Sequence, residues 1–208
     1  MTSRYSCELK NDGSYAKKLK AKLRLWPLSG MLLLIVACSS ELEVPKAAPA
    51  LWDNSPTVAI PVALVITPEL RAEQWKSTRG DQVTARVGEP LAMYAEKMLR
   101  SISSDVTVVR DAADAPAADF IVVPRPPRIE HASELWAHQQ QTFTMALEWR
   151  VTGRDGRVLL QDTVVGEGRD NVGTSISHLR RMGDTFRLAM DDVFRKSRSR
   201  VAPVITGH

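Results

Sequence analysis

The segment that most restricts the fold is TFTMALEWRVT, residues 142–152, in which large apolar side chains recur at every second position. Successive side chains of a β-strand point to opposite faces, so the alternation predicts a strand with one buried and one solvated face. The buried face would hold Phe143, Met145, Leu147, Trp149 and Val151. Asp155-Gly156 is a turn signal, which predicts that residues 158–165 return as the antiparallel partner. Gly166 and Gly168 are expected to end that second strand.

Two amphipathic helices are expected to cover the buried face. Pro90 suits the first turn of a helix that opens at Gly88-Glu89. Its apolar residues recur at helical spacing, at Leu91, Tyr94, Ala95, Met98, Leu99 and Ile102. A second helix, capped by Thr174 or Ser175, has the stripe Ile176, Leu179, Met182, Phe186, Ala189, Met190 and Val193. The cationic segment 195–200 suits a helix C-terminus, so residues 200–208 are expected to form a loose tail.

Shorter β-branched runs predict the remaining strands, at residues 62–66, 82–87, 105–110 and 119–123. Together with the hairpin and the helices, they predict an α+β fold. The sheet should be mixed and largely antiparallel, with two helices on one face. Residues 57–199 are expected to form a single domain, because a segment of this length can bury one hydrophobic core.

The beginning of the chain has the pattern of an export signal. Residues 17–24, KKLKAKLR, are cationic, and the apolar stretch that follows ends in MLLLIVA at residues 31–37. The junction Ile35-Val36-Ala37-Cys38 resembles the lipobox of bacterial lipoprotein precursors. That resemblance implies that residues 1–37 are a signal peptide, that Cys38 carries acyl chains such as palmitate, and that cleavage precedes it. An uncleaved transmembrane anchor is the alternative, although the apolar stretch is shorter than the ~20 residues that a span needs.

The residues after Cys38 imply a location. In enterobacterial lipoproteins an Asp after the cysteine favours the inner membrane, so by resemblance Ser39 and Ser40 are sorting residues for the outer membrane. The domain would then face the periplasm, and the inner membrane is the alternative. Residues 38–56 are rich in Ser, Pro and Ala and lack a sustained period, so a flexible tether is expected behind the lipidated cysteine.

The net charge of +4 comes from the predicted signal peptide, residues 1–37. Residues 1–37 contain seven Lys or Arg and two Asp or Glu, which gives a net charge of +5. The remaining residues contain 21 Lys or Arg and 22 Asp or Glu, which gives a net charge of −1. A nucleic-acid-binding domain needs a basic surface of its own, so no nucleic-acid partner is expected.

No motif for catalysis or cofactor binding stands out, so we expect neither an enzyme nor a cofactor. His131 and His138 flank Glu134 in a stretch expected to be a polar loop or short helix, but their spacing matches no zinc motif, and no metal site is expected. Asp191-Asp192 is expected to be solvated on a helix face. The alternative function is an envelope hydrolase with an unrecognised active site, which requires a pocket that joins a histidine to a carboxylate.

The most unusual surface segment is PRPPRIEH, residues 124–131. Pro-rich segments are stiff and lose little entropy on binding. The first residues of this segment after Pro124 are therefore candidates for docking a partner. These are Arg125, Pro126, Pro127 and Arg128. The alternative is a rigid connection that leaves the sheet.

The mature region resembles YajG-like lipoproteins and the auxiliary lipoproteins of ABC-type transport systems. The shared features are the strand VALVI, the helix opened at Gly88-Glu89, the strands VTVV and ADFIVV, and the hairpin EWRVTGRDGRVLLQDTVV. This resemblance implies a non-catalytic, outer-membrane-anchored accessory or binding component of an envelope assembly or transport system. Its partners would be the membrane, through the lipid on Cys38, and an envelope protein, lipid or cell-wall component.

Overall fold

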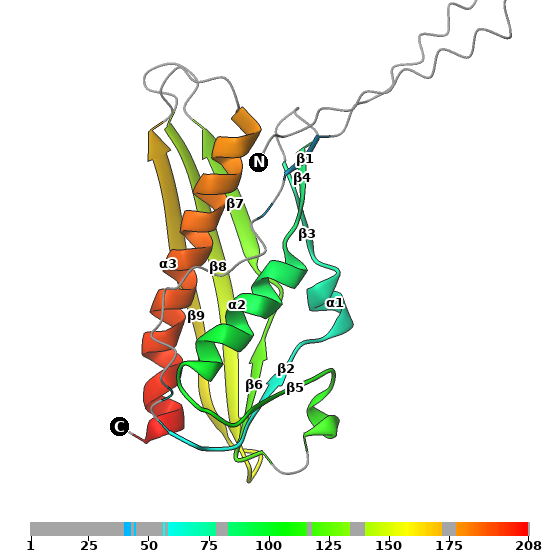
Figure 1. The fold of residues 1–208 in the computed structure, drawn as a ribbon, viewed down its shortest axis with the longest axis vertical. Coiled ribbons are helices and arrows are strands. Elements are labelled where there is room, and N and C mark those ends of the chain that lie inside the picture. The colour runs from blue at the N-terminus through cyan, green and yellow to red at the C-terminus, as the bar shows by residue number, and fades with distance from the viewer. Residues whose placement is uncertain are drawn as a thin grey trace, which may run out of the picture. The chain divides into compact units, whose positions relative to one another are not determined.

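The computed structural model describes residues 40–42, 44, 56, 58–77, 83–115, 118–133, 140–171 and 178–207 (Figure 1). All of these residues belong to one of the two units into which the chain divides, Cys38–His208. Within these ranges lie a six-stranded sheet, a three-stranded sheet and three α-helices. The expected α+β class, with a mixed and mostly antiparallel sheet, is confirmed.

The larger sheet is built around a long antiparallel hairpin, β8 (Gln140–Gly153) and β9 (Val158–Asn171). The turn between these strands is the predicted one, because Gly156 adopts a φ of 80° and its N–H donates to the Gly153 carbonyl at 2.9 Å. A positive φ of this size favours glycine, which explains the residue type at this position.

Four shorter strands complete the sheet on the other edge of β8. They are β2 (Val62–Val65), β5 (Val106–Val109), β6 (Phe120–Pro124) and β7 (Arg128–Ser133). β6 and β7 both pair antiparallel with β8, one behind the other along the same edge. β2 is parallel to both β6 and β5, so the sheet continues from β8 through β6 and β2 to β5.

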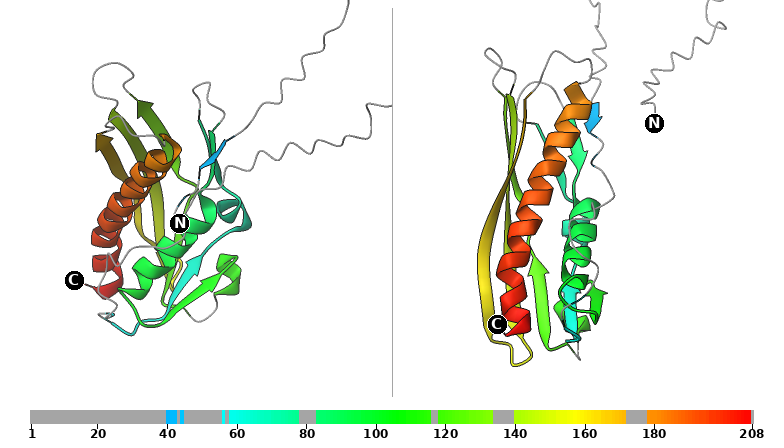
Figure 2. Two further views of the ribbon diagram at one scale, coloured as in Figure 1. Left: turned by 45° about the horizontal axis from the view of Figure 1, so that its top comes forward. Right: turned by 60° about the vertical axis from the view of Figure 1, so that its left-hand side comes forward.

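The alternation along β8 sorts its side chains as predicted. The buried face holds Phe143, Met145, Leu147, Trp149 and Val151. Helix α3 (His178–Thr206) runs along the hairpin and covers this face (Figures 1 and 2). The Phe186 ring lies 5.3 Å from that of Phe143, and the Trp149 indole N–H donates to Ser197 Oγ at 2.7 Å. A buried indole N–H that finds a partner adds no desolvation penalty to the core.

Helix α2 (Gly88–Arg100) packs beside α3 and covers β2 and β5. Its predicted apolar stripe is buried, and Ile102 is buried just beyond its end. The Tyr94 ring lies 5.2 Å from that of Phe194 on α3. Since α2 and α3 touch each other and the buried sheet face, the expectation of two helices on one face is confirmed.

The prediction that Gly166 and Gly168 end the second strand is wrong, because β9 continues through both to Asn171. A Cβ at Gly166 would collide with the backbone of Val193, and one at Gly168 would collide with the Thr185 carbonyl. The two glycines therefore allow α3 to lie directly against β9. Their effect is close packing of a helix on the strand rather than termination of the strand.

The expected loose tail is also wrong for residues 200–206, because α3 continues to Thr206. Val201 and Ile205 are buried and extend the apolar stripe of the helix beyond the cationic segment 195–200. Gly207 follows the last helical residue; it has a φ of 72° and donates its N–H to the Pro203 carbonyl at 3.0 Å.

A smaller sheet includes residues 40–42, so the prediction of a flexible tether is wrong for these residues. It has the order β1 (Ser40–Leu42), β4 (Val83–Arg86) and β3 (Gln74–Lys76), and the short helix α1 (Pro68–Arg71) precedes β3. β1 pairs in parallel with β4, and both Leu42 and Val44 are buried. The folded domain therefore includes residues of the predicted tether, and it starts before residue 57. Residues 45–55 lie outside the described part of the chain.

Candidate functional site

The first described strand begins just behind the predicted lipidation site. Cys38 and Ser39 lie outside the described residues, and Ser40 opens β1 by pairing with Val83. Lipidation at Cys38 and sorting by Ser39 and Ser40 stay predictions. The structure adds that the chain is already part of a sheet two residues after the cysteine.

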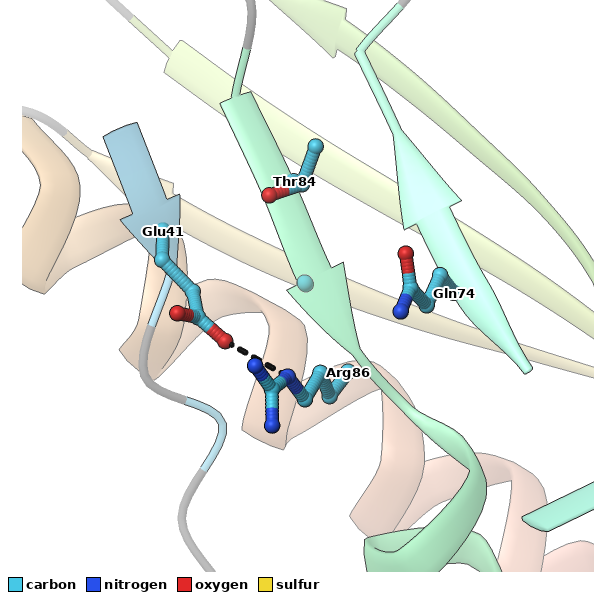
Figure 3. Close-up of a pocket in the computed structure, with 5 residues that line it drawn as sticks. Glu41, Gln74, Thr84 and Arg86 are labelled. Carbon is cyan, nitrogen blue, oxygen red and sulfur yellow. Dashed lines mark ion pairs between the residues drawn. The ribbon is translucent and has the colours of Figure 1, made fainter. Parts of the chain in front are cut away.

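A shallow hollow lies on the small sheet beside this strand (Figure 3). It is lined by Glu41, Gln74, Thr84, Ala85 and Arg86. Glu41 and Arg86 point toward each other across β1 and β4, and Arg86 Nε lies 2.9 Å from Glu41 Oε1. The hollow measures about 110 Å³, well below the ~300–1,000 Å³ of pockets that enclose small molecules. Because both charged side chains are mostly exposed, their ion pair adds at most about 1 kcal/mol.

Trp75 of β3 joins the small sheet to the large one. Its ring lies 5.2 Å from Phe143 on β8 and 5.9 Å from His131 on β7, both edge to face. His131 in turn stacks on Phe143 with ring centroids 4.5 Å apart. The loop or short helix expected around His131 is therefore wrong for residues 131–133, which belong to β7.

Of the histidine cluster discussed in the sequence analysis, the structure describes His131 alone. His131 packs in the aromatic group, whereas Glu134 and His138 lie outside the described ranges. Among the residues that the structure describes, no three His, Cys, Asp or Glu side chains are placed to hold a metal ion. Within the same residues, no helix is both long enough and apolar enough to cross a membrane.

The Pro-rich segment connects β6 to β7 and stays against β8. The Arg125 N–H donates to the Glu148 carbonyl at 3.0 Å, and Arg125 Nε lies 3.7 Å from Glu148 Oε1. Arg125, Pro126 and Arg128 are exposed, and Pro127 is half-buried. The segment thus holds two guanidinium groups at the rim of the sheet without leaving it. Their docking role stays a prediction.

The polar group that sequence reasoning missed lies between α2 and α3. The Tyr94 hydroxyl donates to Asp191 Oδ1 at 2.7 Å, and Arg187 donates to Asp191 Oδ2 at 3.0 Å. On the same side of α3, Arg198 Nε donates to Ser101 Oγ at 3.1 Å. These contacts join the two helices through hydrogen bonds as well as through apolar packing.

The neighbouring carboxylate faces the sheet. The Glu167 N–H on β9 donates to Asp192 Oδ2 at 3.0 Å, and Lys196 Nζ donates to the Val165 carbonyl at 3.0 Å. Lys196 Nζ also lies 2.6 Å from Asp192 Oδ2. Glu167 N–H and Val165 C=O point away from β8, so this pair of α3 side chains occupies backbone groups on the outer edge of β9. Such occupation protects an edge strand from pairing with another chain.

The two adjacent carboxyl groups have opposite pKa shifts. Burial raises the pKa of Asp191, and the hydrogen bonds from Tyr94 and Arg187 offset only part of that effect. Burial also acts to raise the pKa of Asp192, but hydrogen bonds from Lys196, Arg195 and the Glu167 N–H outweigh it and hold that pKa below its ordinary value. Burial, followed by the bond to Asp191, raises the pKa of Tyr94 well above its ordinary value.

The expectation that Asp191-Asp192 is solvated is therefore wrong. Both residues are only partly exposed, and each is bonded to a different neighbouring element. One sequence signal was available, because Tyr94 lies on the apolar stripe of α2 and a buried phenol needs a hydrogen-bond partner. No signal in the sequence identified Asp191 as that partner.

Comparison with known proteins gives only distant likenesses. No family model and no curated protein match the chain. Three solved structures that resemble it are bacterial lipoproteins. A Caulobacter crescentus protein assigned as a lipoprotein is 12% identical, with a TM-score of 0.42 over 59% of this chain and 85% of that chain. A minor lipoprotein of Acinetobacter baumannii is 9% identical, with a TM-score of 0.41 over 68% and 91%.

The third is lipoprotein GNA1162 of Neisseria meningitidis, which is 14% identical with a TM-score of 0.29 over 59% of this chain and 91% of that chain. All three TM-scores lie below 0.5. The resemblance to YajG-like and transport-associated lipoproteins stays a prediction.

Proposed function

We propose that this chain is a lipoprotein of the bacterial outer membrane, anchored through acyl chains on Cys38. Its periplasm-facing domain would act as a non-catalytic binding component of an envelope assembly. The observation that carries the proposal is the lipobox cysteine placed two residues before the first strand of a folded α+β domain. Two or three acyl chains hold a protein on a bilayer, because each buried CH₂ contributes ~0.8 kcal/mol and one chain alone binds only marginally.

The domain offers a surface for a protein partner on the open face of the large sheet, which none of the described helices covers. The pairing register places on it charged side chains of both signs. They are Arg128, Glu130, Glu148, Arg150, Glu167 and Arg169. Arg125 borders this face and pairs with Glu148. A polar face of mixed charge suits a protein partner of complementary charge pattern.

The envelope-hydrolase alternative has no observation in its favour among the described residues. It requires a pocket that joins a histidine to a carboxylate, whereas the described His131 ring stacks on Phe143.

Mass spectrometry of protein purified from envelopes tests the anchor. We expect an acylated cysteine followed by Ser39-Ser40-Glu41, and Cys38→Ala should abolish both the modification and the cleavage before residue 38. An unmodified Cys38 in membrane-purified protein would reject lipidation and favour the short transmembrane anchor.

Crosslinking in intact envelopes tests the binding role. Arg125→Ala with Arg128→Ala should weaken capture of a reproducible envelope partner. The matched control removes two exposed guanidinium groups from the hairpin turn, Arg154→Ala with Arg157→Ala, and should leave capture unchanged. Failure of the unaltered protein to capture any partner would contradict the binding role.

A further inference from the structure

The position of β1 determines which end of the domain lies nearest to the predicted anchor. Ser40 follows Cys38 by two residues, and an extended chain of that length spans at most ~7 Å. Ser40 pairs with Val83, and the next residue of β4, Thr84, pairs with Lys76 of β3. With strands ~4.8 Å apart, Lys76 lies within roughly 10–12 Å of Ser40.

The tip of the long hairpin lies at the opposite end of the domain. Trp75 of the small sheet contacts Phe143, near the start of β8. Gly153, where β8 reaches the turn, is ten residues further along the strand, which corresponds to roughly 34 Å. Figures 1 and 2 show the β8–β9 turn at the end of the domain away from β1.

We propose that the domain stands on the lipid surface on the end formed by β1, β3 and β4, so that the β8–β9 turn points away from the membrane. This inference rests on the proposed anchor at Cys38. It deepens the proposed function by assigning the lipid surface to one end of the domain, which leaves the open face of the large sheet accessible to a partner in the periplasm.

The two long sides of the domain give little reason for it to lie flat. The open sheet face carries three Arg and three Glu side chains, and Arg125 at its border adds one positive charge, so the net charge of this face is small. An anionic leaflet attracts Lys and Arg side chains that lie near it, and a face of nearly balanced charge gains little from that attraction.

Four of the seven Lys and Arg side chains of α3 have acidic partners. Arg187 pairs with Asp191, while Arg195 and Lys196 pair with Asp192. Arg200 Nε lies 3.8 Å from Asp162 Oδ2 on β9. The helix therefore presents fewer uncompensated charges to a bilayer than its sequence contains.

Quenching of a fluorescent probe by lipids that carry a nitroxide on the headgroup tests the orientation. The full, lipidated protein is placed on vesicles, with the probe on a new cysteine at Lys76→Cys or Arg157→Cys. Acylation blocks Cys38, so the probe reacts only with the introduced thiol. We expect severalfold stronger quenching at position 76 than at position 157. Equal quenching at the two positions, or none at position 76, would overturn the proposed orientation.

Flotation of the same vesicles separates the two proposals. If the protein does not float with the vesicles, the lipid anchor itself fails, and the orientation that rests on it fails too. If the protein floats but the quenching pattern is wrong, only the orientation fails. Circular dichroism confirms that each labelled variant is folded, and Thr84→Cys with Arg154→Cys provides a second near and far pair.

Discussion

The hydroxyl of Tyr94 on α2 donates a hydrogen bond to the carboxylate of Asp191 on α3 across 2.7 Å. The residues are 97 positions apart in the chain, and their bond lies at the contact between the two helices. The next residue, Asp192, turns toward β9 and accepts from the Glu167 N–H. Two adjacent carboxylates thus bind α3 to two different layers of the domain.

Removing the Tyr94 hydroxyl should destabilise the domain. Tyr94→Phe leaves a partly buried carboxylate with one donor fewer, and a hydrogen bond to a charged group contributes about 1.5–3 kcal/mol to the free energy of unfolding. Urea unfolding measures this loss. In a double-mutant cycle with Asp191→Ala, which leaves no acceptor for the hydroxyl, the two losses should not add, because both remove the same bond. Additive losses would mean that the bond contributes little.

The two carboxylates should respond to pH in opposite directions. The pKa of Asp191 is raised on folding, so its contribution is fully present below the unfolded value of about 3.8 and is lost as pH rises through the folded pKa. The pKa of Asp192 is lowered, so its contribution is present above 3.8 and is lost as pH falls through the folded pKa.

Asn substitutions at the two positions measure this difference. Asp191→Asn should reduce the free energy of unfolding more at about pH 3 than at pH 7, and Asp192→Asn should reduce it more at pH 7. Asp184→Asn on the exposed side of α3 is the control, and its effect should stay within about 0.5 kcal/mol at either pH. The same pH trend for both test variants would contradict the assigned shifts.

A methyl group at Gly166 should push α3 away from β9. A Cβ there would collide with the backbone of Val193, which cannot move aside as a flexible side chain can. We expect Gly166→Ala to lower the free energy of unfolding by about 1–3 kcal/mol, the usual cost of overpacking. Thr163→Ala on the exposed side of the same strand is the comparison, and a similar loss there would argue against close packing as the cause.

The one-sided sheet predicts unequal damage from a charge on the two faces of β8. Leu147 is fully buried, so Leu147→Asp would place an unpaired carboxylate in the core and should abolish cooperative unfolding. Thr144 lies on the open face and is half-buried, so Thr144→Asp should cost much less. Thermal melts of both variants decide the matter, and equal losses would show that a second layer covers the open face.

The last turns of α3 should contribute to stability. A chain that ends at Ser199 lacks Val201 and Ile205, and each fully buried side chain of this size contributes about 1.5–3 kcal/mol. Its denaturation midpoint should fall well below that of the complete chain. A chain that ends at Gly207 removes only the final residue and should match the complete chain.

Much of the fold could be predicted where the pattern is local. The alternation along residues 142–152, the Asp155-Gly156 turn and the stripe from Leu91 to Ile102 each follow from the period of one element, and the structure confirms all three. A side-chain period depends only on whether the backbone is extended or helical, so it can be read without knowing what packs against it.

The tertiary structure decided the features that depend on a neighbouring element. Gly166 and Gly168 could equally have ended a strand, and only the passage of α3 over β9 explains why the strand continues through them. Leu42 lies in a segment without a period, and it becomes part of the core because β4 offers an edge for β1. In the sequence, Asp191 and Asp192 are two adjacent residues of the same type. In the structure they have different partners, on α2 and on β9, and their pKa values shift in opposite directions. Burial and hydrogen bonding are properties of a contact between elements, so sequence periodicity alone does not contain them.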